Sequence, residues 1–189
     1  MTDHPILRVL ARVLDVLARA GVECAVMGGF AVRHWAIPRP TYDVDFAVSL
    51  EGDALVHLLR TLEKEGFVVD RQFTSGFTDA LSGMRKVNIG CFESGTVWRI
   101  DIFLATTPFA RSAFDRRVPT EFEGMKLSVV TAEDLLLFKL LADRHKDRMD
   151  VEDMLLVCGQ LDTAYLRKWA EHLGISDRLE RALRESGRA

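Results

Sequence analysis

The spacing of apolar residues predicts helices and strands that alternate over the first two thirds of the chain. Apolar side chains three and four positions apart predict amphipathic helices, and short apolar runs bounded by turn residues predict buried strands. The predicted helices here are residues 6–20, 30–35 and 53–65, and the predicted strands are 22–27, 44–50, 84–92, 96–104 and 126–130. Glu93-Ser94-Gly95 separates two of these strands and predicts a hairpin turn.

After residue 130 the pattern is helical throughout. Thr131 and Asp134 form a capping box at the start of a very apolar segment. The predicted helices are residues 133–144, 147–158, 164–172 and 177–185. We therefore expect an α+β fold: a mixed β-sheet core with flanking helices in residues 1–130, followed by a C-terminal helical part, residues 131–189, packed on that core.

Composition excludes several classes of protein. Of the 189 residues, 48% are apolar, which is enough for a sizeable core and excludes general disorder. A net charge of −3 argues against a protein that coats nucleic acid. Three scattered cysteines without C-x-x-C spacing argue against a disulfide framework and a zinc site. No segment has the length of a membrane helix or the order of a signal peptide, so we expect a cytoplasmic protein without a membrane partner.

Two aspartates open the second predicted strand. Side chains alternate along a strand, so Asp43 and Asp45 point to the same face. Two carboxylates at such a short distance repel each other unless a positive group lies between them. In proteins this group is usually a divalent metal ion. The alternative is a pair of solvated turn residues.

A third aspartate, Asp101, lies within a strand that is otherwise built for burial. A buried carboxylate must be paired or bind a metal, so the alternative here is a salt bridge to a neighbour such as Arg99 or Arg85. If adjacent strands bring Asp43, Asp45 and Asp101 together, they make a site for Mg²⁺ or Mn²⁺. Two bridged ions suit in-line phosphoryl or nucleotidyl displacement.

Gly28 and Gly29 follow the first predicted strand and precede the acidic pair. Glycines after a strand let the backbone approach a phosphate and let the amides of the following helix point at it. The alternative is an ordinary tight turn.

Together these residues resemble the nucleotidyltransferase superfamily that shares the DNA polymerase β core. More narrowly, Gly28-Gly29-Phe30-Ala31-Val32 with Arg39-x-Thr41-x-Asp43-Val44-Asp45-Phe46 resembles the AbiEii-type toxin nucleotidyltransferases and related uncharacterised proteins. The resemblance implies that Asp43, Asp45 and Asp101 are catalytic and bind the metal ions. It also implies that Gly28 and Gly29 hold the nucleoside triphosphate. Phe30 departs from the Ser found there in many members, which leaves the phosphate contact to backbone amides.

Three further residues are candidates for nucleotide binding. Lys139 is the one charge within an apolar helix, so it extends to the surface, pairs with Asp143 or reaches into a cleft. The AbiEii resemblance assigns a lysine on this helix to the phosphates and places the second acid of Lys-Asp-x-x-Asp, here Asp150, in the cleft. Arg39 lies between two prolines, where it reaches a phosphate or is a solvated loop residue.

The resulting hypothesis is a Mg²⁺-dependent nucleotidyltransferase that moves a nucleoside monophosphate from an NTP, ATP included, to an acceptor hydroxyl. The toxin-like resemblance implies tRNA or protein as acceptor and an antitoxin as partner. One alternative is an antibiotic-type transferase acting on a small molecule, such as an aminoglycoside or lincosamide. Another is a non-catalytic nucleotide-binding or interaction module on the same fold. Metal-dependent phosphoester hydrolysis ranks last, because it gives no reason for the two glycines.

Overall fold

The computed structural model describes residues 4–69, 77–78 and 84–188. The helices are α1 (Pro5–Arg19), α2 (Gly28–Trp35), α3 (Gly52–Lys64), α4 (Pro108–Asp115), α5 (Ala132–Ala142), α6 (His145–Val157), α7 (Thr163–Leu173) and α8 (Ser176–Glu185). The strands are β1 (Cys24–Met27), β2 (Asp43–Val48), β3 (Phe67–Val69), β4 (Phe77–Thr78), β5 (Arg85–Glu93), β6 (Thr96–Leu104), β7 (Val118–Phe122) and β8 (Met125–Val129).

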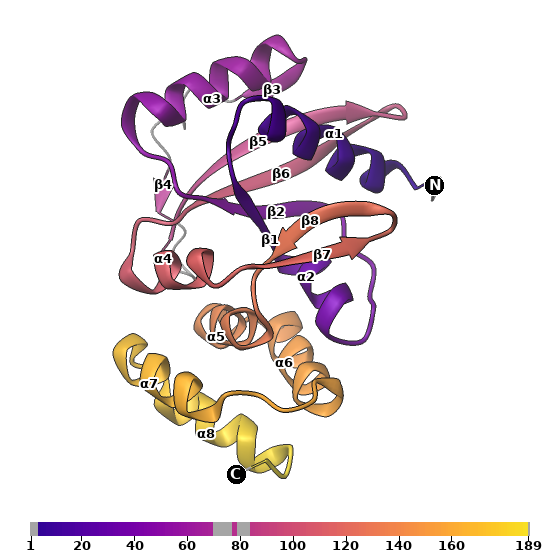
Figure 1. Ribbon diagram of the computed structural model, residues 1–189. Helices are drawn as coiled ribbons and strands as arrows, with labels where there is room; N and C mark the ends of the chain where they lie inside the picture. The colour runs from indigo at the N-terminus through magenta and orange to yellow at the C-terminus, as the bar shows by residue number, and fades with distance from the viewer. Residues whose placement is uncertain (1–3, 70–76, 79–83, 189) are drawn as a thin grey trace.

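The strands form one mixed sheet (Figure 1). Seven of them run in the order β3-β5-β6-β2-β1-β8-β7, and β4 pairs with β5 beside this path. β2 pairs with β6 in parallel, and β1 pairs with β8 in parallel, whereas the remaining neighbours are antiparallel. The parallel pairing of β2 with β6 places two segments far apart in the sequence side by side.

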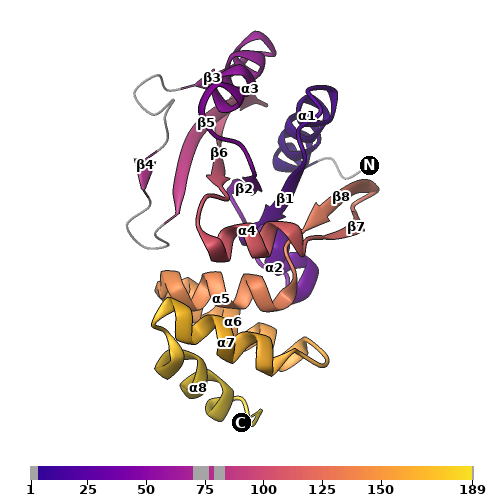
Figure 2. The ribbon, with the colours of Figure 1, turned by 60° about the vertical axis from the view of Figure 1, so that its left-hand side comes forward.

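Helices α1 and α3 cover one face of the sheet, here called the inner face (Figures 1 and 2). Alternate side chains of the central strands, such as Val44, Phe46 and Ile100, pack against these helices in one core cluster. The intervening residues point to the opposite side, here called the outer face, which carries Asp43, Asp45 and Asp101.

The four C-terminal helices lie together at one end of the sheet, beside α2 and α4 (Figure 2). A second core cluster runs from Ala25 and Met27 of β1 through α4 and α5 to Leu179 and Leu183 of α8. Apolar contact is therefore continuous across residue 130, where the sequence predicts the division between the α/β core and the helical part.

Most predicted elements are present. The β5–β6 hairpin turns at Ser94 and Gly95, both with positive φ, as the sequence predicts. Thr131 caps α5 by accepting a hydrogen bond of 3.2 Å from the backbone amide of Asp134. The predicted helix 133–144 ends early, at Ala142, because Asp143 takes the left-handed conformation.

Four elements were missed: β3, β4, α4 and β7. Thr107 before Pro108 is a helix-start signal, and its hydroxyl does cap α4. Glu123-Gly124 repeats the turn chemistry of Ser94-Gly95 and joins β7 to β8. Both signals were available in the sequence.

No helix in the described part of the chain combines the length and the apolar content that crossing a membrane requires.

Candidate active site

The three predicted acids lie on neighbouring strands of the outer face. Asp45 of β2 pairs directly with Asp101 of β6, and Asp43 pairs with Arg99. Neighbouring strands of a sheet lie about 4.8 Å apart, so paired residues on the same face are close neighbours. The sequence prediction that Asp43, Asp45 and Asp101 meet on one surface therefore agrees with the register of the sheet.

Gly28 and Gly29 lie tightly against this acidic row. Gly28 has a φ of +60°, and a Cβ atom there would lie 1.9 Å from Oδ2 of Asp45. A Cβ atom on Gly29 would lie 2.3 Å from Oγ1 of Thr41. Both positions require glycine, because any side chain would displace Asp45 or Thr41. The two glycines also begin α2, whose first turn has no side-chain cap, and both line the pocket.

Basic side chains neutralise two of the three carboxylates. Arg99 Nη2 lies 2.7 Å from Asp43 Oδ2, and Arg99 Nε lies 3.4 Å from Asp101 Oδ1. Lys86 Nζ donates a hydrogen bond of 3.0 Å to Asp101 Oδ2. The salt bridge considered for Asp101 thus exists with Arg99, and Lys86 takes the role considered for Arg85.

Asp45 differs from its two neighbours because no hydrogen bond or ion pair to it is formed by the described residues. Burial, followed by the charges of Asp43 and Asp101, raises the pKa of Asp45 to about 7. For Asp43, burial acts to raise the pKa, but the hydrogen bond and charge of Arg99 outweigh it and lower the pKa below its usual range. The site therefore has one carboxyl group without a pairing cation, Asp45, beside two that basic side chains contact.

Lys139 of α5 is buried and bound by two carboxylates of α6. Its Nζ lies 3.0 Å from Asp147 Oδ1 and 2.8 Å from Asp150 Oδ2. Of the three alternatives considered for Lys139, the pair with Asp143 is not formed, because that residue ends α5 and binds Arg148. Lys139 nevertheless borders the same pocket as the three acids.

Arg39 also borders that pocket, and it binds Asp150 through Nε at 2.6 Å and Nη2 at 2.8 Å. Asp150 itself is fully buried beneath Arg39 and Lys139 and is not among the residues that line the pocket, whereas Asp147 is. The expectation that Asp150 lines the cleft therefore needs correction. Asp147 borders the pocket, and Asp150 lies buried behind it, where it binds Arg39 and Lys139.

Three cations at the pocket were missed in the sequence: Lys86, Lys146 and Arg144, the last of which pairs with Asp147. Lys86 follows Arg85 at the start of β5, where strand alternation alone would have placed it on the outer face. Lys146 is exposed, borders the pocket and lies close enough to Asp43 to lower its pKa. The described part of the chain offers Lys146 no ion-pair or hydrogen-bond partner, so its charge is available to a ligand.

Phe30 and Arg33 point away from the acids. Phe30 is buried in the inner-face core and packs edge-on against Phe122, with ring centroids 5.8 Å apart. Arg33 pairs with Glu123 at 3.4 Å. Phe30 therefore fills the core and does not enter the pocket that the acids line.

The oxygen donors of the three carboxylates suit a divalent cation, although their side chains do not converge on a single point. Among the described residues no three acidic, histidine or cysteine side chains converge on a point that would hold a metal ion. Arg99 instead contacts both Asp43 and Asp101. Oδ1 of Asp101 accepts no hydrogen bond from the described residues, and the raised pKa of Asp45 marks a carboxyl group without a pairing cation.

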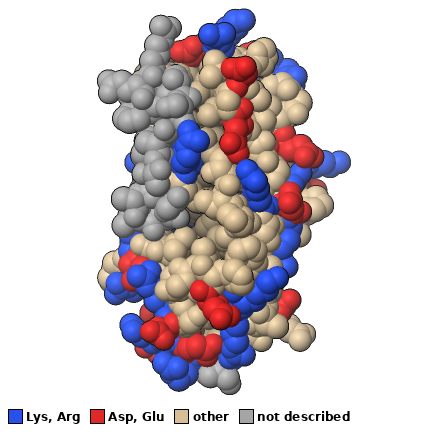
Figure 3. All heavy atoms as spheres, turned by 90° about the vertical axis from the view of Figure 1, so that its left-hand side faces the viewer, with Lys and Arg blue, Asp and Glu red and all other residues tan. Residues whose placement is uncertain are grey.

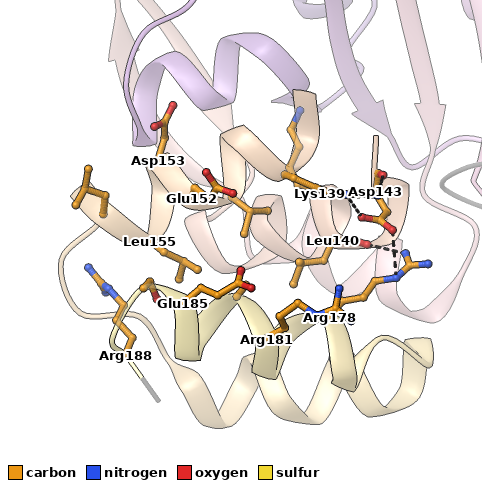
Figure 4. Close-up of a pocket in the computed structure, with 15 residues that line it drawn as sticks. Lys139, Leu140, Asp143, Glu152, Asp153, Leu155, Arg178, Arg181, Glu185 and Arg188 are labelled. Carbon is orange, nitrogen blue, oxygen red and sulfur yellow. Dashed lines mark hydrogen bonds and ion pairs between the residues drawn. The ribbon is translucent and has the colours of Figure 1, made fainter. Parts of the chain in front are cut away.

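A larger cavity, of about 970 Å³, lies between α8 and the pair α5–α6 (Figure 4). Arg178 bounds it through a hydrogen bond of 2.9 Å to the carbonyl of Leu140. Lys139 borders this cavity as well, but Figure 4 shows its side chain extending away from α8. None of Asp43, Asp45 and Asp101 borders it, so the acidic pocket remains the candidate active site.

Several solved structures share this fold at low sequence identity. The antibiotic-resistance factor ANT(2'')-Ia matches with a TM-score of 0.55 and 14% identity, over 94% of each chain. A candidate nucleotidyltransferase of Thermotoga maritima matches with a TM-score of 0.53 and 16% identity, over 88% of this chain and 93% of the other. The lincosamide antibiotic adenylyltransferase LnuA, bound to lincomycin, matches with a TM-score of 0.51 and 15% identity, over 77% of this chain and 93% of the other. The chain has a nucleotidyltransferase-like fold.

No protein-family model matches the chain, and no curated protein matches it. The resemblance to AbiEii-type toxins therefore remains a prediction from the motifs.

Proposed function

We propose that this protein is a metal-dependent nucleotidyltransferase that transfers a nucleoside monophosphate from an NTP to an acceptor hydroxyl and releases pyrophosphate. The observation that carries the proposal is the pairing of Asp45 with Asp101 across two parallel strands, with the backbone of Gly28 pressed against Asp45. This arrangement joins a cation-binding surface to a phosphate-binding helix start.

The residues have distinct roles in this proposal. Asp43, Asp45 and Asp101 would hold Mg²⁺ or Mn²⁺, which supplies charge neutralisation for the transferred phosphoryl group. The α2 amides of Gly28 and Gly29 would bind the phosphates, with Lys146 at the mouth of the pocket. Lys139 and Arg39 would orient the site through Asp147 and Asp150, because their charges are already paired.

The first experiment incubates the protein with each α-³²P-labelled NTP, Mg²⁺ or Mn²⁺, total RNA and cell lysate. Asp45→Asn and Asp101→Asn should each reduce labelling at least about 1,000-fold, because they remove metal ligands and retain side-chain size. Asp53→Asn, an exposed position on α3, is the matched control and should label like the wild type. Label that persists in both site variants would overturn the proposal.

The acceptor class follows from the same assay. The toxin-like motifs favour tRNA or protein, with an antitoxin as neutralising partner. A small-molecule hydroxyl is the second candidate, favoured by the likeness to ANT(2'')-Ia and LnuA. The face in Figure 3 mixes acidic and basic side chains, and the net charge is −3, so neither feature favours RNA over a small molecule. Binding of an RNA acceptor should weaken steeply with added salt, whereas binding of a neutral small molecule should not.

A further inference from the structure

The only asparagine of the chain, Asn88, lies in line with the acidic row. It pairs with Asp101 across β5 and β6, and Asp101 pairs with Asp45 across β6 and β2. The three side chains therefore form a row of oxygen donors over three adjacent strands, on the outer face. Asn88 occupies the end of this row that lies away from Gly28.

Two buried oxygens in this row lack a hydrogen-bond donor within the described part of the chain: Oδ1 of Asn88 and Oδ1 of Asp101. Asp101 is only 3% exposed. Buried acceptors without partners are costly, at about 1–3 kcal/mol each, and are rare in folded proteins. Two of them on directly paired residues leave a place for one shared partner, which is either a cation or a hydrogen-bond donor.

Two basic side chains lie near these oxygens, but neither donates a hydrogen bond to them. Lys86 binds the other oxygen of Asp101, at 3.0 Å. Arg99 Nε lies 3.4 Å from Asp101 Oδ1 without hydrogen-bond geometry, and the Arg99 side chain is 58% exposed. Because Arg99 is held only by Asp43 and Asp101 within the described residues, it can swing into solvent when a cation enters.

We propose that Asn88 is a ligand of a divalent cation, which its amide oxygen and Asp101 Oδ1 share between β5 and β6. Mg²⁺ and Mn²⁺ accept neutral amide oxygens beside carboxylates, so the residue types fit. The inference rests on the proposed function, because it adds a ligand to the same carboxylates. Arg99 competes with the cation for Asp101. The affinity for the cation therefore depends on Arg99, which opposes binding, and on Asn88, which supports it.

The test is titration of the full chain with Mn²⁺ alone, followed by electron paramagnetic resonance of free Mn²⁺, so that no turnover is needed. Asn88→Ala should weaken Mn²⁺ binding about tenfold or more, a typical loss for a disturbed metal site. Asn88→Asp should bind at least as tightly as the wild type, since it keeps the oxygen and adds charge. Arg99→Ala should tighten binding, and Thr96→Ala, exposed on β6, should leave it unchanged. Circular dichroism melting checks that every variant is folded.

The outcomes separate this inference from the proposed function. If Asp45→Asn and Asp101→Asn weaken Mn²⁺ binding while Asn88→Ala does not, Asn88 is not a ligand, and the transferase proposal stands. If the wild type and Arg99→Ala both fail to bind Mn²⁺ at millimolar concentration, the cation site is refuted. In that case the partner of the two oxygens is a neutral hydrogen-bond donor, such as a buried water molecule, and the labelling assay decides the proposed function on its own.

Discussion

Arg39 and Asp150, 111 residues apart in the sequence, are joined by two hydrogen bonds from one guanidinium group to one carboxylate. Arg39 lies in the loop that leads into β2, and Asp150 lies in α6. The pair therefore ties the start of the acid-bearing strand to the helical part. Lys139 binds the same carboxylate, at 2.8 Å from its Oδ2, so Asp150 serves as the common anchor of two cations.

Replacing Arg39 with lysine tests this anchor. An ammonium group cannot make the two parallel hydrogen bonds, so Arg39→Lys should lower the free energy of unfolding by about 1–3 kcal/mol in urea denaturation. Arg60→Lys, at an exposed position of α3, is the control and should change little. Unchanged stability together with weakened NTP binding would instead make Arg39 a direct phosphate ligand.

Asp45→Asn should stabilise the metal-free protein at high pH only. Because the folded-state pKa of Asp45 is about 7, above the ordinary value of 3.8, the folded state binds more protons than the unfolded state between these values. Ionised Asp45 therefore costs stability increasingly as the pH rises from about 4 to about 7. We expect Asn to raise Tm by about 5 °C at pH 8 and to leave it unchanged at pH 4. An equal effect at both pH values would contradict the charge argument.

Gly28→Ala should disrupt both the fold and the site. The added methyl group would overlap Asp45, and a φ of +60° is unfavourable for alanine. The free energy of unfolding should therefore fall by about 2 kcal/mol or more. Mn²⁺ affinity should fall with it, since Asp45 must move. Gly159→Ala is the matched control, because nothing lies within 4 Å of its Cβ and its φ is not positive. Wild-type stability and Mn²⁺ affinity in Gly28→Ala would refute the close packing.

The two lysines at the pocket should separate stability from ligand binding. Lys139→Met leaves Asp147 and Asp150 buried with one cation fewer. The free energy of unfolding should therefore fall by about 3 kcal/mol, as for other broken buried ion pairs. Lys146→Ala removes an exposed charge and should leave Tm unchanged. Its affinity for a fluorescent ATP analogue with Mg²⁺ should fall about tenfold, or about 1.4 kcal/mol. If only Lys139→Met lost ATP affinity while keeping its stability, the roles would be reversed.

The sequence predicts the acids better than their surroundings. Asp43, Asp45 and Asp101 are identifiable because carboxylates interrupt apolar strands, and strand alternation fixes their face. Gly28 and Gly29 are identifiable from their place between a strand and a helix. These features are local, and local patterns determine which face a residue occupies.

The partners of those residues were not predictable, because they depend on pairing between distant segments. Asn88 is an ordinary strand residue until β5 pairs with β6 and brings it beside Asp101. Asp147 and Asp150 are three residues apart, yet only the packing of α6 decides that the first borders the pocket and the second lies behind it. The start of α4 and the end of β7 differ in this respect, because a cap at Thr107 and a turn at Glu123-Gly124 are local signals in the sequence.

The parallel pairing of β2 with β6 also has a consequence for folding. Asp45 and Asp101 become neighbours only after the intervening chain, with α3 and the β5–β6 hairpin, has closed into a large loop. Contacts of such high sequence separation form slowly, because the entropy of loop closure opposes them. Mn²⁺ added during refolding should therefore be bound only in the last kinetic phase, and a nascent chain that has not yet completed β6 lacks the site entirely.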